Sequence, residues 1–283
     1  MYKLITIIFI SSIFIQNALA IEKKYSSPHV LGNGQVSTFV KYNKNKPIEI
    51  GVEITEAAFY GLPTTASDGK WDVVDRQGNV IMPCCGHEIV MNYPKWVLKN
   101  TNFKHFVLNW NPQGHVPSGI YDIPHFDFHF YTITNQQRQN IKVAKAEDRC
   151  YVVDHFVPMT CDMYNKSVKA LPVTAFPTRH SDVGAVEPGM GNHLLDLSYP
   201  EFNNGIFTHT WIFGTFDGEM ILYEPMITKV FLESLTRKMC VNYVSAKRST
   251  KKGWYPTQYC MSFSPKKHRY TVSLTKFEWF KIP

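Results

Sequence analysis

An alternating run of aromatic and ionisable residues at 124–131, PHFDFHFY, constrains the fold of this chain more than any other feature. Successive side chains of a β-strand point to opposite faces, so His125, Asp127, His129 and Tyr131 would share one face. The three phenylalanines between them would form the other face. The segment therefore predicts a strand that lies between an apolar core and a polar site.

Strand signals dominate the rest of the chain, where β-branched and aromatic runs are separated by Gly, Pro, Asn and Asp. Strands are expected at residues 35–42, 48–54, 70–74, 79–82, 104–110, 121–134, 205–215, 219–227, 238–244, 258–264 and 269–280. Short helical turns are expected at 55–60 and after Thr228, and a long ordered loop at 166–188. This pattern predicts a mainly β protein, either an antiparallel barrel or a double-sheet jelly roll with few short helices.

The first twenty residues have the pattern of a cleavable signal peptide. Lys3 precedes an apolar run at 4–15, and Ala18-Leu19-Ala20 follows as a small-x-small cleavage site, so cleavage is expected after Ala20. The apolar run is too short to span a bilayer, and no later segment is long enough either. We expect a secreted or periplasmic protein without a membrane span, whose residues 21–283 form a single β-barrel domain.

The charge of the chain indicates its partners only weakly. The formal net charge is +7, and the basic residues are dispersed along the sequence rather than grouped in a nucleic-acid-binding motif. We expect a small molecule or a metal ion as partner, and no nucleic acid. The apolar face of 126–130 could pack on a second sheet or on another subunit, which leaves a homo-oligomer open.

Six cysteines form an even set, which favours disulfide pairing in an oxidising compartment. Proximity along the chain pairs Cys150 with Cys161, and Cys240 with Cys260. The neighbouring Cys84 and Cys85 remain ambiguous, because they could be free, pair elsewhere, or bind a metal with His87.

The geometry of a strand limits how the 125–129 row can bind a metal ion. Residues two apart on one face lie about 6.6 Å apart, within reach of one ion, whereas residues four apart lie about 13 Å apart. Asp127 is therefore expected to share an ion with one of the histidines, or to orient a ligating ring. His125 and His129 are not expected to ligate the same ion unless a bulge bends the strand.

A second polar cluster is expected in a hairpin around Asp217-Gly218, a strong two-residue turn signal. Unbroken pairing from that turn places Glu224 opposite Trp211. His209 would then be a diagonal neighbour on the same face as Glu224. The hairpin thus predicts a carboxylate and an imidazole side by side.

A glycine-flanked loop at 189–196 presents a further histidine, His193. The combined prediction is a site for one divalent transition metal, Zn, Fe, Mn, Ni or Cu, since imidazole with carboxylate suits all of these ions. The predicted ligands are His125, Asp127, His129, His193 and Glu224, with His209, Tyr131 and Trp211 as supporting or alternative residues. The alternative is a hydrogen-bonded polar network without a metal.

Several segments resemble the signatures of a family of secreted bacterial proteins of unknown function. The segments are 55–63, 114–117 (GHVP), 119–122 (GIYD), 124–131, 190–193 (MGNH) and 224–228 (EPMIT). The resemblance spans roughly 48–228, leaves 229–283 as a C-terminal β extension, and departs at Leu194, where the family has an aromatic residue. It implies a β-barrel related in shape to allene oxide cyclase and the cupins, but no activity.

Two classes of function are compatible with these features. The first is metal-dependent chemistry on a small molecule, with the metal as Lewis acid. The second is a non-enzymatic envelope protein that captures a small ligand or a metal. No Gly-x-Ser-x-Gly motif is present, which disfavours serine hydrolase chemistry, and no catalytic residue is assigned.

Overall fold

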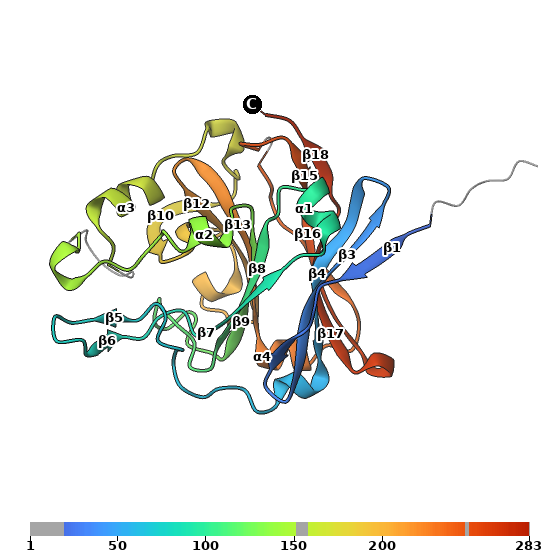
Figure 1. Ribbon diagram of the computed structural model, residues 1–283, viewed down its shortest axis with the longest axis horizontal. Coiled ribbons are helices and arrows are strands. Elements are labelled where there is room, and N and C mark those ends of the chain that lie inside the picture. The colour runs from blue at the N-terminus through green and yellow to red at the C-terminus, as the bar shows by residue number, and fades with distance from the viewer. Residues whose placement is uncertain (1–19, 151–157, 247–248, 283) are drawn as a thin grey trace, which may run out of the picture.

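Two antiparallel sheets of seven strands each dominate the protein. Figure 1 shows their arrangement in the computed structural model. The structure describes residues 20–150, 158–246 and 249–282. The predicted signal peptide lies almost entirely outside these residues. The mainly β, antiparallel character expected from the sequence is confirmed.

The first sheet has the order β1-β3-β4-β17-β16-β14, and β2 pairs with β3 beside β1. Its strands are β1 Glu22–Tyr25, β2 His29–Leu31, β3 Gly34–Asn43, β4 Lys46–Thr55, β14 Met239–Asn242, β16 Gln258–Ser264 and β17 Arg269–Thr275. The chain after residue 228 thus contributes three strands to this sheet, and β17 pairs along its whole length with β4.

The second sheet has the order β10-β11-β12-β13-β9-β8-β7. Its strands are β7 His87–Asn92, β8 His105–Asn111, β9 His125–Tyr131, β10 Ser181–Glu187, β11 Gly191–Leu195, β12 His209–Phe216 and β13 Glu219–Thr228. Two small ribbons accompany the large sheets. They pair β5 Val73–Val74 with β6 Val80–Met82, and β15 Gly253–Tyr255 with β18 Glu278–Phe280.

The helices among the described residues are short and lie in the connections. The α-helices are α1 Lys95–Asn100, α2 Asn135–Arg138, α3 Cys161–Ser167 and α4 Lys229–Glu233. The 3-10 turns are η1 Glu56–Phe59, η2 Ala146–Asp148, η3 Val173–Ala175, η4 Pro200–Phe202 and η5 Pro265–Lys267. Two match expectation, since η1 lies in the 55–60 segment and Thr228 caps α4 through its side chain. No helix within the described ranges is long and apolar enough to cross a membrane.

The two large sheets pack face to face around one apolar core. The alternating phenylalanines of β9, Phe126, Phe128 and Phe130, are fully buried in the same cluster as Val52 of β4 and Val272 of β17. The first sheet is thus the packing partner of the phenylalanine face of β9. The polar residues of β9 consequently lie on the outer face of their sheet, turned away from the first sheet.

The barrel expectation is not met, because the strand pairings of the described residues form separate sheets and close no barrel. The site-bearing face is covered by loops rather than by the wall of a barrel. Two further segments differ from expectation. Part of the 166–188 segment forms strand β10, and the loop expected around His193 is the edge-proximal strand β11, paired on both sides.

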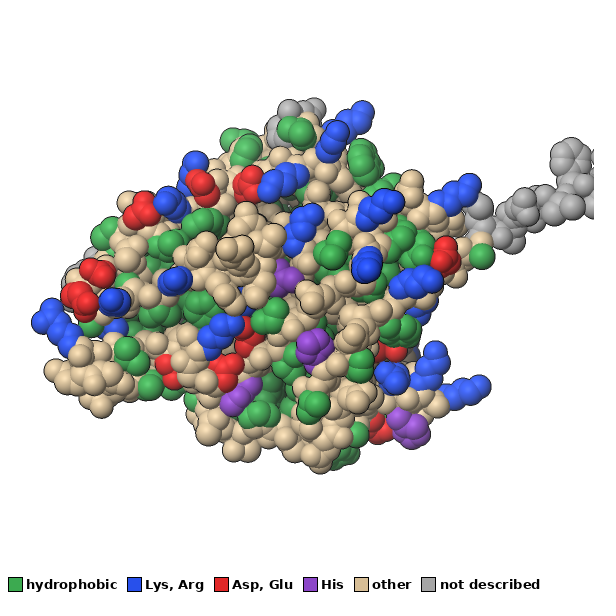
Figure 2. All heavy atoms as spheres, in the orientation of Figure 1, with side chains coloured by type: hydrophobic (Ala, Val, Ile, Leu, Met, Phe, Trp, Pro, Cys, Tyr) green, Lys and Arg blue, Asp and Glu red, His purple; other side chains and the backbone are tan. Residues whose placement is uncertain are grey.

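Three disulfides join all six cysteines. Cys150–Cys161 and Cys240–Cys260 are present as expected. Cys84 and Cys85 pair with each other, which was not among the alternatives drawn from the sequence. Disulfides are typical of proteins from an oxidising, extracellular-type compartment. Lys and Arg side chains are spread over the face shown in Figure 2, in keeping with the dispersed charge of the sequence.

Candidate metal centre

The polar row of β9 lies beside β13 on the outer face of the second sheet. In the antiparallel register Phe130 lies opposite Tyr223 and Asp127 opposite Met226, which places His129 opposite Glu224. Side chains directly opposite in such a pair are within contact distance. The pairing of two distant segments therefore brings an imidazole to a carboxylate on one face.

A cavity of about 290 Å³ lies over this row. Its floor includes Asp127, His193 and Glu224, and its walls come from loops that follow β6 and β8 and from strand β10. The loop contribution includes the disulfide pair Cys84–Cys85 and His115. The polar row is thus buried in the protein yet borders a space large enough for a small molecule.

Glu224 joins two histidines at one end of the row. Its Oε1 lies 2.9 Å from His129 Nε2, and its Oε2 lies 3.6 Å from His193 Nε2. Burial alone would raise the pKa of Glu224, but the two imidazoles outweigh burial and lower it to about 2. Burial alone would lower the pKa of His193, but the contact with Glu224 outweighs burial and raises it. The carboxylate is therefore ionised and available as a ligand.

Asp127 joins two other histidines at the opposite end. Its Oδ1 lies 3.2 Å from His125 Nε2, its Oδ2 lies 3.6 Å from His115 Nε2, and the Asn111 amide donates to Oδ2 at 2.7 Å. Burial favours the neutral acid, but the histidines hold the pKa of Asp127 well below its usual range. The same contact overcomes burial at His115 and raises its pKa to about 9.

Backbone carbonyl groups orient three of the four imidazoles. The Nδ1 atoms of His125, His193 and His115 lie 2.6, 3.0 and 2.6 Å from the carbonyl oxygens of Ile123, Ala185 and Val116. A carbonyl oxygen only accepts, so each Nδ1 must carry the hydrogen. Once the ring is neutral, each Nε2 offers a lone pair to the centre of the cluster, as metal-binding histidines do.

Several buried atoms of the cluster have no hydrogen-bond partner among the described residues: His125 Nε2, His129 Nδ1, Asp127 Oδ1 and Glu224 Oε2. Leaving such atoms unpaired costs roughly 1–3 kcal/mol each, more when they are charged. A cation placed between lone pairs removes that cost. The unpaired atoms thus mark where a ligand would be bound.

Three groups of three potential ligand atoms lie within 4.8 Å of one another among the described residues. One of them, Cys84, Cys85 and Glu187, contains a disulfide. The other two belong to the polar cluster: His115, His125 and Asp127, and Asp127, His129 and Glu224. Ligand atoms roughly 2.1 Å from a tetrahedral zinc ion are about 3.4 Å apart, so a small contraction would close either group on an ion. His125 and His129 fall in different groups, as the spacing along the strand predicted.

The structure brings together the five predicted ligands but separates two of the supporting residues from them. A bulge between Gly214 and Thr215 shifts the hairpin register, so that Trp211 lies opposite Pro225 and Ile212 opposite Glu224. The prediction that Trp211 and His209 share a face with Glu224 was therefore wrong. Both residues point toward the first sheet, where Trp211 is fully buried and His209 contacts the Tyr259 hydroxyl at 2.7 Å.

Tyr131 shares the outer face with the cluster but belongs to its surroundings. Its ring is stacked on His105 and is fully buried. The Arg138 guanidinium lies 5.4 Å from the centre of the Tyr131 ring. Tyr131 does not line the cavity, so a supporting position is the role that its placement allows.

The sequence interpretation missed three elements of the cavity: His115, Glu187 and the Cys84–Cys85 disulfide. Burial raises the pKa of Glu187 to about 7, and its carboxylate lies 3.9 Å from Cys84 Sγ. His115 stood in the GHVP segment, ten residues before His125, but a loop residue gives no periodic signal. Only the folding of the loop between β8 and β9 over the outer face of the second sheet brings His115 to Asp127.

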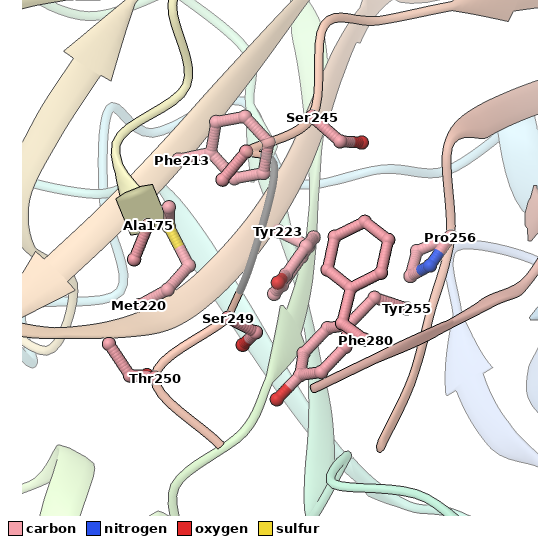
Figure 3. A pocket seen from close by; sticks show the side chains of 11 residues that line it. Ala175, Phe213, Met220, Tyr223, Ser245, Ser249, Thr250, Tyr255, Pro256 and Phe280 are labelled. Carbon is pink, nitrogen blue, oxygen red and sulfur yellow. The ribbon is translucent and has the colours of Figure 1, made fainter. Parts of the chain in front are cut away.

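A much smaller cavity lies between strands β12 and β13 of the second sheet and the small ribbon β15–β18, and is drawn in Figure 3. Its volume of about 10 Å³ is near the minimum for one water molecule. Tyr223, Tyr255 and Phe280 contribute aromatic rings to it, and no histidine or carboxylate is among the described residues that line it. Within the described ranges, this small cavity therefore lacks the imidazole and carboxylate groups that border the larger one.

Comparisons with models of protein families, with characterised proteins and with solved structures found no match to this chain.

Proposed function

We propose that the protein binds a divalent transition metal ion in the cavity through His129, His193 and Glu224, with Asp127 completing the site. The observation that carries the proposal is the group of Asp127, His129 and Glu224, whose ligand atoms lie within 4.8 Å of one another. Beside it, several buried imidazole and carboxylate atoms of the cluster have no hydrogen-bond partner among the described residues. Zinc, iron, manganese, nickel and copper all accept this ligand set. The metal-free network expected as an alternative would leave these atoms unsatisfied.

The bound ion would act as a Lewis acid on a small molecule in the cavity. Such an ion polarises a carbonyl or phosphoryl oxygen, or activates a water molecule at neutral pH. Beyond the polar floor, apolar side chains line much of the cavity: Met82, Pro83, Val116, Met190, Leu195, Ile212 and Met226. These walls favour a mainly apolar substrate with one polar group directed at the ion.

The setting of this activity is an exported protein. The three disulfides agree with an oxidising compartment, and the pattern at residues 1–20 predicts export. The resemblance to a secreted bacterial family with a cupin-like or allene oxide cyclase-like barrel remains a prediction. Our proposal rests on the cluster itself and does not need that relationship.

The test is the metal content of the exported protein, purified without chelators and measured by plasma mass spectrometry. The wild type is expected to carry transition metal, and the His193→Asn/Glu224→Gln double variant to lose the ion bound by these residues. A matched control, His209→Asn/Glu53→Gln, removes one imidazole and one carboxylate from the first-sheet side and should keep the metal. Equal metal content in all three proteins, each folded, would sink the proposal.

The mainly apolar walls also favour a second function, the non-catalytic capture of an apolar ligand or of the metal. The two functions differ in turnover. Conversion of esters, phosphate esters or oxidisable aromatics by the metal-loaded protein, lost in the His193→Asn/Glu224→Gln variant, would establish the enzyme. Metal binding and ligand retention without turnover would establish the capture protein.

A further inference from the structure

The polar cluster contains more ligand atoms than one ion can use. Its two groups of three meet at Asp127, which belongs to both. The proposed ion accounts for the group around Glu224. His115 and His125 at the other end of the row remain without a role.

The imidazoles of His115 and His125 are arranged as a pair of ligands. Their ring centres are 4.6 Å apart and the ring planes are inclined by 74°. Both rings direct Nε2 toward Asp127. His115 Nε2 lies 3.6 Å from Oδ2, and His125 Nε2 lies 3.2 Å from Oδ1. Each ring is fixed by its Nδ1 contact with a backbone carbonyl, so neither needs a change of orientation to bind an ion.

The contact between His125 and Asp127 is close but is not a hydrogen bond. Nε2 and Oδ1 lie 3.2 Å apart, yet both atoms are without a hydrogen-bond partner among the described residues. Neither atom is aimed at the other in hydrogen-bonding geometry. Two lone-pair atoms at this separation have the spacing of neighbouring ligands on one cation.

A neutral donor holds the shared carboxylate in place. The Asn111 side chain donates to Asp127 Oδ2 at 2.7 Å and is fully buried beside it on β8. Outer contacts of this kind orient a ligating carboxylate. Asp127 is therefore positioned between the two histidine pairs rather than bonded exclusively to either.

We propose that the cavity binds two divalent transition metal ions, one on His115, His125 and Asp127 and one on His129, His193 and Glu224, with the Asp127 carboxylate shared between them. The inference rests on the proposed function, whose ion is the second of these. Ions held about 3.5–4 Å apart are the arrangement with which enzymes clamp the attacking and leaving oxygens of a hydrolysed ester or phosphate ester.

The charges around the cavity are compatible with two ions. Asp127 and Glu224 are ligands, and Glu187 lines the same cavity. These three carboxylates together with one bound hydroxide would balance two divalent cations. A buried pair of ions without such compensation would be costly.

Cobalt(II) is a suitable probe because it replaces zinc and is paramagnetic. Full-length exported protein is stripped of metal, loaded with cobalt(II), freed of excess ion and analysed by plasma mass spectrometry and electron paramagnetic resonance. We expect about two cobalt ions per chain and a spectrum changed by magnetic coupling between them. The His115→Asn variant should bind one ion, with the spectrum of an isolated cobalt centre.

Two further variants make the result specific. His193→Asn/Glu224→Gln should also bind one uncoupled ion, because it retains the His115 group. His268→Asn removes an exposed histidine far from the cavity and should retain two coupled ions.

The outcomes separate this inference from the proposed function. One uncoupled ion in both the wild type and His115→Asn would overturn the second ion and leave the proposed function standing. Two coupled ions in His115→Asn would also overturn it, since His115 would then not be a ligand. No bound ion in the wild type would overturn both proposals. The wild-type spectrum decides between one ion and two even if His115→Asn does not fold.

Discussion

The outer faces of the two large sheets both bury carboxylates, but they treat them differently. On the first sheet, Glu49 accepts from Lys41 at 2.5 Å and from the Ser273 hydroxyl at 2.8 Å. Glu53 contacts the Lys23 ammonium with one oxygen and the Tyr25 hydroxyl, at 3.0 Å, with the other. Every oxygen of these two carboxylates thus has a hydrogen-bond donor.

On the second sheet, the carboxylates of the cavity face imidazoles instead of ammonium groups. Asp127 Oδ1 and Glu224 Oε2 have no hydrogen-bond partner among the described residues. A lysine can only donate, whereas a neutral imidazole also offers a lone pair. The comparison teaches that burial of a charge does not by itself mark a binding site. Imidazole and carboxylate ligand atoms that lie close together and keep unused lone pairs do.

Glu88 on β7 is an internal control, because it is buried on the same sheet as the cavity cluster but is paired with cations. It contacts Arg138 and Lys70, and Trp71 donates to it at 3.2 Å. Glu88→Gln should cost about 3–5 kcal/mol of unfolding free energy at neutral pH, since Arg138 would remain buried without its partner. Urea unfolding measures the loss, and metal binding in this variant should stay at the wild-type level.

The same pair predicts part of the pH dependence of stability. Burial raises the pKa of Glu88, but Arg138 and Lys70 outweigh burial and lower it from 4.5 to about 2. The lower folded-state pKa means that the stabilisation is complete above about pH 4.5 and is lost as the pH falls toward 2. The loss amounts to about 3 kcal/mol in the wild type. A Glu88→Gln variant with the same acid sensitivity would contradict this assignment.

Metal binding should stabilise the folded protein through the residues of the cavity and not through the carboxylates of the first sheet. At a free metal concentration a hundredfold above Kd, one bound ion adds about 2.7 kcal/mol to the unfolding free energy. Denaturant unfolding with and without zinc should show this gain in the wild type and in Glu49→Gln, but only in diminished form in Glu224→Gln. An equal gain in Glu224→Gln would show that the ion binds elsewhere.

The smallest effect is expected at the ion pair between Lys23 and Glu53 on the first sheet, where Lys23 is partly exposed. Glu53→Gln should cost at most about 1 kcal/mol, because the partly exposed Lys23 can turn to solvent. Metal content should not change. A large loss of metal in this variant would remove the distinction between the two faces.

Much of the fold followed from local patterns. Alternation in 124–131 predicted the two faces of β9, the Asp217-Gly218 turn is present, and the capped turn after Thr228 forms. The alternation did not reveal β10 and β11, because Pro and Gly around 166–191 resemble a loop. Neither did it predict separate sheets in place of a barrel, which depends on which strand edges meet.

The candidate site was predictable in composition but not in arrangement. The sequence identified five of its residues, since charged groups between buried aromatics need a reason to be there. It misplaced His209 and Trp211 because a one-residue bulge reverses the facing of a strand. It missed His115 because a loop residue has no periodicity.

The sequence by itself determined which side chains share a face of each strand, because that alternation is a property of the extended backbone. It also indicated the paired cysteines at 150 and 161 and at 240 and 260, close along the chain. Only the tertiary structure decided that β13 brings Glu224 to His129, that a loop carries His115 to Asp127, and that lone pairs remain unmatched between them. Those contacts join residues far apart in sequence, so they depend on how the sheets pair and pack.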